Sequence, residues 1–207
     1  WRALLQWLGG IGILVIALVI LPFLRIGGMQ IFHLEGDDPY EKFLPKISSV
    51  VSKIIIVYSV LTAILFILYY LAEMSLFDAL AHSFTTISTG GFSTHNESFA
   101  YFNSSKILLI AIVFMIIGSF PFLVIAQTSL NNFFAVVKDH QTRLFLFILL
   151  VSISIIYFFA QEYVSGNIIE KTITIAFNTI SIISGTGFIS ENFENWGNYA
   201  SVLFLLL

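Results

Sequence analysis

Two short strings of Gly, Ser, Thr and Phe contain the residue types in this sequence that could do chemistry. The N-terminal string (88–93) contains Ser88, Thr89, Gly90, Gly91 and Phe92, and the C-terminal string (184–190) contains Ser184, Gly185, Thr186, Gly187 and Phe188. Successive backbone carbonyls can replace the hydration shell of an alkali cation, and Gly tolerates the backbone angles that this needs. The strings therefore predict a carbonyl-lined filter for K⁺. The alternative is a Gly-rich packing site or a plain loop.

The two strings occupy matching places in an internal repeat. A shift of 96 residues places Ile87 over Ile183 and Gly91 over Gly187, and the neighbouring Ser and Phe residues also coincide. Each string follows a short, moderately apolar helical stretch, in residues 76–94 and 168–190. Duplicated units in membrane proteins commonly frame a permeation path. The repetition favours the filter over the plain loop, and the C-terminal, negative end of a helix favours a cation beside it.

The composition requires a membrane environment for the elements that hold these strings. Of the 207 residues, 58% are hydrophobic and only 10% are charged, whereas soluble domains carry about 25% charged residues. Nine Lys and Arg against twelve Asp and Glu leave no basic face for nucleic acid. The absence of Cys excludes disulfides, thiolate metal sites and cysteine nucleophiles. We therefore predict an all-α integral membrane protein.

Charged residues bracket the apolar runs that are long enough to cross a bilayer. The expected spans are 3–24, 54–72, 107–137 and 144–161, and the last run, 199–207, is too short to cross. Run 107–137 is too long for one straight helix and should be interrupted at Gly118, Ser119, Phe120 and Pro121, because Pro breaks the helical hydrogen-bond ladder. The segments 76–94 and 168–190 are predicted to re-enter the membrane without crossing it. The chain starts at Trp1 and ends inside an apolar run, so we expect an internal piece of a longer protein.

Basic residues near the span ends indicate an orientation. One side of the predicted topology carries six of them, Arg25, Lys42, Lys46, Lys53, Lys138 and Arg143, and the other carries three, Arg2, Lys106 and Lys171. The positive-inside rule places the first side in the cytoplasm. Both strings then enter from the outer side. That side also carries most of the acidic residues, which would attract cations or are simply solvated loop charges.

Several motifs resemble the Trk-type potassium uptake proteins, the membrane subunits of the Trk/Ktr/HKT superfamily. They are residues 1–12 (WRALLQWLGGIG), 21–22 with 27–30, 82–95, and 177–181 through 187–188. The resemblance implies four helix–pore-helix–helix repeats around one pathway, about two of them present here. Residues 1–49 would close the second repeat and include a cytoplasmic loop, residues 50–142 would form the third repeat, and residues 143–207 would form a truncated fourth repeat. The family's filter glycine maps onto Gly91 and Gly187.

The same resemblance implies a function and its setting. The chain would contribute to potassium uptake as a multi-pass protein of the cell inner (plasma) membrane, with K⁺ as the transported ion and no cofactor. An intramembrane gating loop would lie at Gly118, Ser119, Phe120 and Pro121. The implied partners are a second copy in a homodimer, the lipid bilayer, and a cytosolic nucleotide-binding regulatory subunit on the loops 26–52 and 130–142. Passive conduction and ion-coupled symport both remain open.

Two other classes of protein fit the same residues less well. A secondary transporter of another cation or small solute would be expected to hold a charged side chain at mid-membrane, and the spans carry none. An intramembrane enzyme would need a nucleophile with a base, or paired carboxylates or histidines, and no such set lies at membrane depth. His82 and His95, which flank the N-terminal string, are interpreted as capping or mouth residues. Asp78 is placed in the first turn of the short helix, where a carboxylate is favourable.

Overall fold

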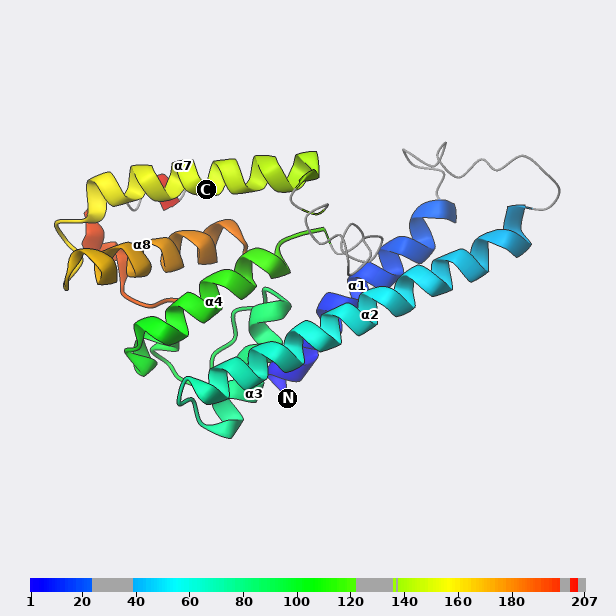
Figure 1. Cartoon of the computed structure of the whole chain (residues 1–207), viewed down its shortest axis with the longest axis horizontal. Coiled ribbons are helices and arrows are strands. Elements are labelled where there is room, and N and C mark those ends of the chain that lie inside the picture. Colours follow the sequence, from blue (N-terminus) through cyan, green and yellow to red (C-terminus); the bar gives the residue numbers. More distant parts are fainter. Residues whose placement is uncertain (24–38, 122–135, 137, 198–201, 205–207) are drawn as a thin grey trace.

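A computed structural model describes residues 1–23, 39–121, 136, 138–197 and 202–204. The described part of the chain is helical and contains no strand (Figure 1). Its α-helices are α1 (Arg2–Phe23), α2 (Pro39–Leu71), α3 (Leu76–Ile87), α4 (Ser105–Gly118), α7 (His140–Ala160) and α8 (Ile168–Ile183), and its short 3₁₀ turns are η2 (Ser98–Phe102) and η4 (Phe193–Trp196).

Two helices have the length and apolar character needed to cross a membrane. These are Ser49–Leu71 within α2 and His140–Ala160, with mean hydropathies of 2.5 and 2.4. Only 28% and 17% of these windows are buried inside the molecule, so most of their apolar surface faces outward. Helix α1, with 22 residues, has a similar length. Helix α2 runs back to Pro39, so the span expected from residue 54 is preceded by further helix.

Helix α4 ends where the sequence predicted an interruption. It stops at Gly118 after 14 residues, and the amide of Ser119 donates to the carbonyls of Met115 and Ile116 in a tight closing turn. The apolar run that begins at residue 107 is therefore helical only as far as Gly118 within residues 107–121. The rest of that run up to residue 135, most of the loop 130–142, residues 24–38 of the first loop, and most of the last apolar run (198–201 and 205–207) lie outside the described residues.

The two short helices are delimited by local capping. Ser75 accepts a hydrogen bond from the amide of Asp78 at 3.1 Å and so caps the start of α3. Asn167 and Glu170 form a reciprocal capping box at the start of α8. Helix α3 has 12 residues and α8 has 16, which corresponds to about 18 and 24 Å of helix. Neither length is enough to cross a hydrocarbon core of about 30 Å.

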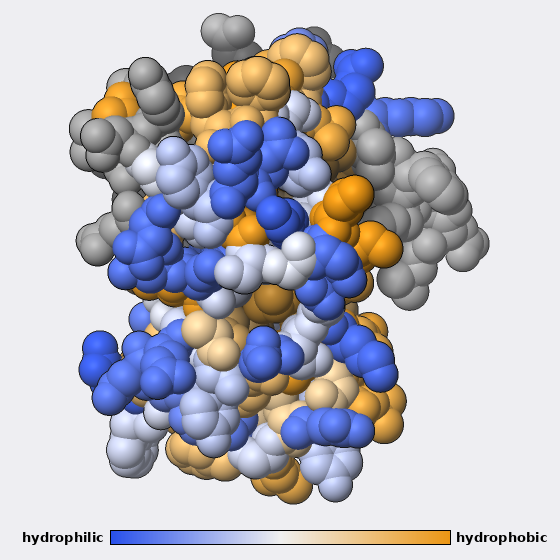
Figure 2. Space-filling view, turned by 90° about the vertical axis from the view of Figure 1, so that its left-hand side faces the viewer, coloured by the Kyte–Doolittle hydropathy of each residue, from blue (hydrophilic) through white to orange (hydrophobic). Residues whose placement is uncertain are grey.

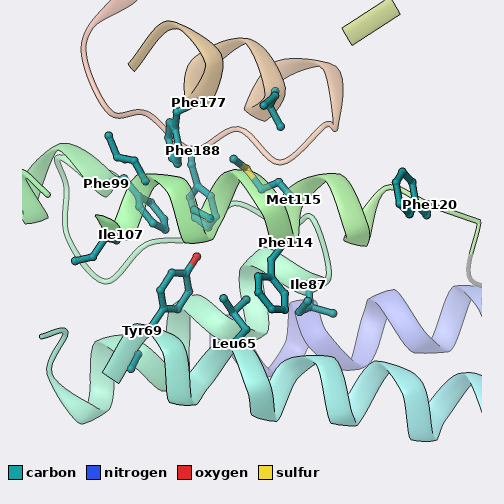
Figure 3. Close-up of a cluster of buried hydrophobic side chains, with 14 of the residues drawn as sticks. Leu65, Tyr69, Ile87, Phe99, Ile107, Phe114, Met115, Phe120, Phe177 and Phe188 are labelled. Atoms are coloured by element: carbon teal, nitrogen blue, oxygen red, sulfur yellow. The ribbon is translucent and has the colours of Figure 1, made fainter. Parts of the chain in front are cut away.

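The longer helices surround these short ones. Helix α3 packs against α1, α2 and α4, and α8 packs against α4 and α7 (Figure 1). Helix α4 thus joins the two halves of the molecule. The core between them is rich in aromatic side chains, and Figure 3 shows Phe99, Phe177 and Phe188 close together, with the ring of Phe99 tilted against the other two. All three side chains are almost fully buried.

One end of the molecule gathers the connections that the sequence placed on the outer side. The C-terminal ends of α2 and α7 and the N-terminal ends of α4 and α8 lie together at the left of Figure 1. Exposed charged residues follow or open these helices, namely Glu73, Lys106, Glu162 and Glu170. Figure 2 looks onto this end and shows hydrophilic residues gathered between hydrophobic flanks. The arrangement gives the molecule one polar end next to largely apolar sides.

Candidate functional site

Both strings begin at the C-terminal end of a short helix. Ser88 caps α3 and Ser184 caps α8, and each keeps a helical backbone conformation. The last carbonyls of both helices therefore lie beside a string, and they carry the negative end of the helix dipole. This placement agrees with the sequence expectation that each string follows a short helix.

The two strings follow the same backbone path. Thr89 and Gly185, which match under the 96-residue shift, have φ of +48° and +73°, and Gly91 and Gly187 have φ of +71° and +82°. The amide of Gly91 donates to the carbonyl of Thr85 at 3.4 Å, as the amide of Gly187 donates to that of Ser181 at 3.0 Å. A β-branched residue with positive φ, as at Thr89, is strained. The backbone conformation of the string is therefore imposed by the surrounding structure and does not follow from the preference of each residue.

The strings meet at their glycines. A β-carbon built on Gly91 would overlap the carbonyl oxygen of Thr186, so only Gly fits at this close approach. Beyond the strings, the amide of Ala100 donates to the carbonyl of Ile189 at 3.2 Å, and the amide of Ile189 donates to the hydroxyl of Ser98 at 3.2 Å. These contacts join segments that lie about ninety residues apart in the chain.

Several carbonyls of the strings have no hydrogen-bond donor within the part of the chain that the structure describes. They belong to Thr89, Gly91, Thr186 and Gly187. Other carbonyls are engaged: that of Ser88 by the hydroxyl of Thr89 at 2.8 Å, and that of Phe188 by the hydroxyl of Ser181 at 2.8 Å. A peptide carbonyl without a donor is a suitable ligand for a partly dehydrated alkali cation. The arrangement can therefore bind a cation through backbone oxygens.

A residue that the sequence analysis did not select holds the N-terminal string. The side-chain amide of Gln6, on α1, donates to the carbonyl of Gly90 at 2.8 Å and accepts from the amide of Phe92 at 3.3 Å. The guanidinium of Arg2 lies over the ring of Phe92, 4.9 Å from its centre. The only sequence signal for this role is the place of Gln6 inside the motif at residues 1–12.

The C-terminal string is held by its own helix. Asn178 donates to the hydroxyl of Ser190 at 2.9 Å and accepts from the amide of Ser190 at 3.2 Å. The hydroxyls of Ser184 and Thr186 form a hydrogen bond of 2.7 Å. The side chain of Phe188 is 1% exposed and packs on Phe99 with ring centres 4.5 Å apart. The phenyl ring of Phe188 therefore anchors the string in the core, and Phe188 contributes only its backbone to the turn.

A polar network fastens the exit of the N-terminal string to α3. His82 is fully buried, and its ring nitrogens bond the carbonyl of Asp78 at 2.8 Å and the hydroxyl of Ser93 at 2.9 Å. The carboxylate of Asp78 accepts from the hydroxyls of Thr94 and Ser75, and the ring of His95 lies 3.2 Å from it. Burial lowers the pKa of His82. Burial alone would raise the pKa of Asp78, but these hydrogen bonds outweigh it and lower the pKa.

The predicted gate residues lie directly against the end of α3. A β-carbon on Gly118 would lie 3.0 Å from the carbonyl oxygen of Ile87, so the end of α4 touches the turn that opens the N-terminal string. The hydroxyl of Ser119 donates to the carbonyl of Met115 at 2.7 Å. Phe120 is buried and meets Phe145 of α7 edge-on, with ring centres 6.3 Å apart (Figure 3 shows Phe120 at the end of α4). Pro121 is half-buried.

The described residues contain no group of three His, Asp or Glu side chains that could hold a metal ion. Any ion at the strings would thus depend on backbone and hydroxyl oxygens. The sequence-predicted site residues are brought together in two sets. The two strings converge at Gly91 and Thr186, and the gate residues Gly118 to Pro121 lie at and just beyond the C-terminal end of α4.

Comparison with known proteins finds one family that matches nearly the whole chain. Residues 1–200 match TrkH, described as a cation transport protein. The chain is 34% identical to the Trk system potassium uptake protein TrkI of Halomonas elongata over 210 residues, which cover 100% of this chain and 42% of the relative. It is also 34% identical to the Trk system potassium uptake protein TrkH of Escherichia coli K12, covering 99% of this chain and 43% of the relative.

A solved structure is also similar. The crystal structure of the potassium transporter TrkH from Vibrio parahaemolyticus superposes with a TM-score of 0.82 at 32% sequence identity. The match covers 99% of this chain and 42% of that chain. The chain therefore spans less than half the length of the relatives that it matches.

Proposed function

The chain belongs to the TrkH family of cation transport proteins, and from this premise we propose that it forms part of a potassium uptake pathway. The relatives carry potassium uptake in their names, and the chain corresponds to about two-fifths of their length. We therefore assign to this segment a share of the filter and of the gate. The protein would lie in the cell inner membrane and cross it several times.

The observation that carries the proposal is the convergence of two duplicated strings at the ends of two short helices. Thr89, Gly91, Thr186 and Gly187 present carbonyls without a donor in the described structure, and the helix ends add negative potential. K⁺ requires several oxygens of modest strength to replace its water. Two strings supply part of that set, and two equivalent strings from chain outside residues 1–207 would complete a ring. Residues 50–142 and 143–207 then act as two of the four repeats.

The end of α4 is proposed as the gate. Gly118 touches the turn at Ile87 that opens the N-terminal string, and Phe120 is fixed between α4 and Phe145 of α7. A movement of the segment from Gly118 to Pro121 would therefore displace the turn that opens the N-terminal string. Replacing these four residues with a continuous Ala/Leu helix is expected to change the open probability in single-channel or flux recordings. Unaltered flux and unaltered regulation would remove the gate from the proposal.

The remaining assignments concern assembly and orientation. The polar end in Figure 2 would face outward, and the segments around residues 26–52 and 130–142, which carry Lys42, Lys46 and Lys138, would face the cytoplasm. A second copy of the protein and a cytosolic nucleotide-binding subunit are the proposed partners, on family grounds. Chemical labelling of Lys106 and Lys53 from either side of sealed vesicles tests the orientation, since the two should react from opposite sides.

The function is tested with the complete natural protein that contains this chain, reconstituted in liposomes. We expect uptake of K⁺ and Rb⁺ to exceed uptake of Na⁺, and Gly91→Ser to reduce that preference, because a side chain there displaces the string. Gly9→Ser is the control, since Gly9 lies exposed on α1 and a β-carbon there would meet no atom within 4 Å in the described structure. Equal selectivity of the wild type and Gly91→Ser would refute the filter assignment.

A further inference from the structure

We propose that Gln6 is a positioning residue for ion selection, acting through the backbone of the N-terminal string. The inference rests on the proposed function, because it concerns which carbonyls of the string face a transported cation. Gln6 lies on α1, outside the repeat to which the string belongs, and 84 residues from Gly90.

The geometry is that of a side chain imitating a neighbouring strand. The Nε2 atom of Gln6 donates to the carbonyl of Gly90 at 2.8 Å, and the Oε1 atom accepts from the amide of Phe92 at 3.3 Å. A carboxamide offers one donor edge and one acceptor, which matches a backbone carbonyl and the backbone amide two residues later. These two hydrogen bonds engage the Gly90 carbonyl, so that it is not available to a transported cation. The neighbouring carbonyls of Thr89 and Gly91 have no donor in the described structure.

The rotational setting of α1 is fixed by further contacts on the same face. The indole nitrogen of Trp7 donates to the hydroxyl of Thr62 at 3.0 Å, and the hydroxyl of Tyr58 donates to the carbonyl of Trp7 at 3.2 Å. One turn further along, a β-carbon on Gly10 would lie 3.2 Å from the β-carbon of Ser88. These contacts fix α1 against α2 and against the start of the string. The side chain of Gln6 is therefore held at a defined position beside Gly90.

The contact is also tight on the side of the string. Gly90 does not have a positive φ, so its conformation is open to other residues. A β-carbon there would nevertheless lie 2.5 Å from Oε1 of Gln6. Glycine at position 90 is therefore explained by Gln6 and not by backbone conformation, whereas glycine at position 91 is required by both φ and the carbonyl of Thr186.

The test measures the ratio of K⁺ to Na⁺ uptake by the complete protein in liposomes for Gln6→Ala, Gln6→Glu and Leu5→Ala. Leu5 is the matched control, because it is the preceding residue of the same helix turn and its side chain is 61% exposed. We expect Gln6→Ala to lower the ratio by about tenfold, the scale of one or two lost hydrogen bonds. The ratio for Leu5→Ala should stay at the wild-type value.

Gln6→Glu keeps the size and the acceptor but loses the donor to Gly90, so it tests the same contact if Gln6→Ala fails to fold. Its added charge alone would change the affinity for both cations alike, whereas loss of the donor changes their ratio. A wild-type ratio in both Gln6 variants, with a wild type that discriminates K⁺ from Na⁺, would overturn the inference and leave the proposed function intact. A wild type without such discrimination would overturn the proposed function itself.

A double variant provides an independent check. Gly90→Ala alone should lower the ratio, because the new methyl group pushes against Gln6. In the Gln6→Ala background, the same change should have a smaller additional effect, since Oε1 is gone. Fully additive effects of Gly90→Ala and Gln6→Ala would contradict a direct action of Gln6 on the string.

Discussion

The two strings share a backbone path but differ in what holds them. The C-terminal string is fastened by its own helix, since the hydroxyl of Ser181 donates to the carbonyl of Phe188 at 2.8 Å. At the matching place in α3, the hydroxyl of Thr85 turns back to the helix and donates to the carbonyl of Ala81 at 3.2 Å. The N-terminal string is held from outside by Gln6 of α1.

The C-terminal ends of the two strings also differ in the side chains that hold them. Asn178 alone binds the side chain and the amide of Ser190. Its counterpart under the 96-residue shift, His82, binds Ser93 as one member of a network that includes Asp78 and His95. A duplicated backbone can therefore be kept while its supports diverge. The N-terminal string is hydrogen-bonded to Gln6 of α1 and to the titratable His82, whereas the hydrogen bonds described for the C-terminal string come from Asn178, Ser181 and Ser98.

The largest expected effect comes from adding a methyl group to the two matched glycines. Gly91→Ala would place a β-carbon against the carbonyl of Thr186 and would also force alanine into a left-handed φ. We therefore expect the free energy of unfolding to fall by roughly 3 kcal/mol. A β-carbon at Gly187 meets no atom within 4 Å in the described part of the chain, so Gly187→Ala should lower the free energy of unfolding by only about 1–2 kcal/mol, through its φ. Thermal unfolding of the purified variants in detergent measures the difference. Equal losses would mean that the strings are not in close contact at Gly91.

A smaller effect separates the internal supports. Ser181→Ala removes the hydroxyl that holds the carbonyl of Phe188, and about 1 kcal/mol of local stability should be lost. Thr85→Val keeps the shape of the side chain and removes a hydroxyl that bonds only its own helix, so its cost should stay within about 0.5 kcal/mol. The change is measured by hydrogen exchange of the backbone amides at the C-terminal end of each string. Faster exchange near Phe92 in Thr85→Val would show that the two supports are equivalent after all.

The smallest effect is confined to acid pH and to the N-terminal string. Because hydrogen bonds lower the pKa of Asp78 below its ordinary 3.8, its carboxylate stabilises the fold above that value. This contribution is lost as the pH falls through the lowered pKa. The midpoint of thermal unfolding of the wild type should therefore drop below about pH 4 by more than that of Asp78→Asn. Parallel pH profiles of the two proteins would exclude Asp78 from the support of the string.

Much of the architecture could be predicted from the sequence because its causes are local. The interruption of the long apolar run at Gly118, the short helix before each string and the glycines with positive φ all follow from helix propensity, apolar length and residue shape. The sequence does not predict the start of α2 at Pro39, because charged residues mark the limits of the apolar span and not those of the helix. A helix can continue beyond the apolar core, where its charged residues are solvated.

The supports of the strings could not be predicted in the same way. Gln6 and Gly90 are separated by 84 residues, and nothing in either segment indicates the other. The packing of Phe120 on Phe145 likewise depends on where α4 and α7 meet. The roles of both pairs become visible only when the helices are placed side by side.

The amino-acid sequence alone determined that this chain is a helical membrane protein with two duplicated Gly-rich turns, because solvation and backbone sterics act on each residue and its near neighbours. The tertiary structure decided which carbonyls of those turns are engaged and which have no donor, and which residues fix them. That choice depends on the relative positions of helices distant in the sequence, where a displacement of about 1 Å is enough to break a hydrogen bond.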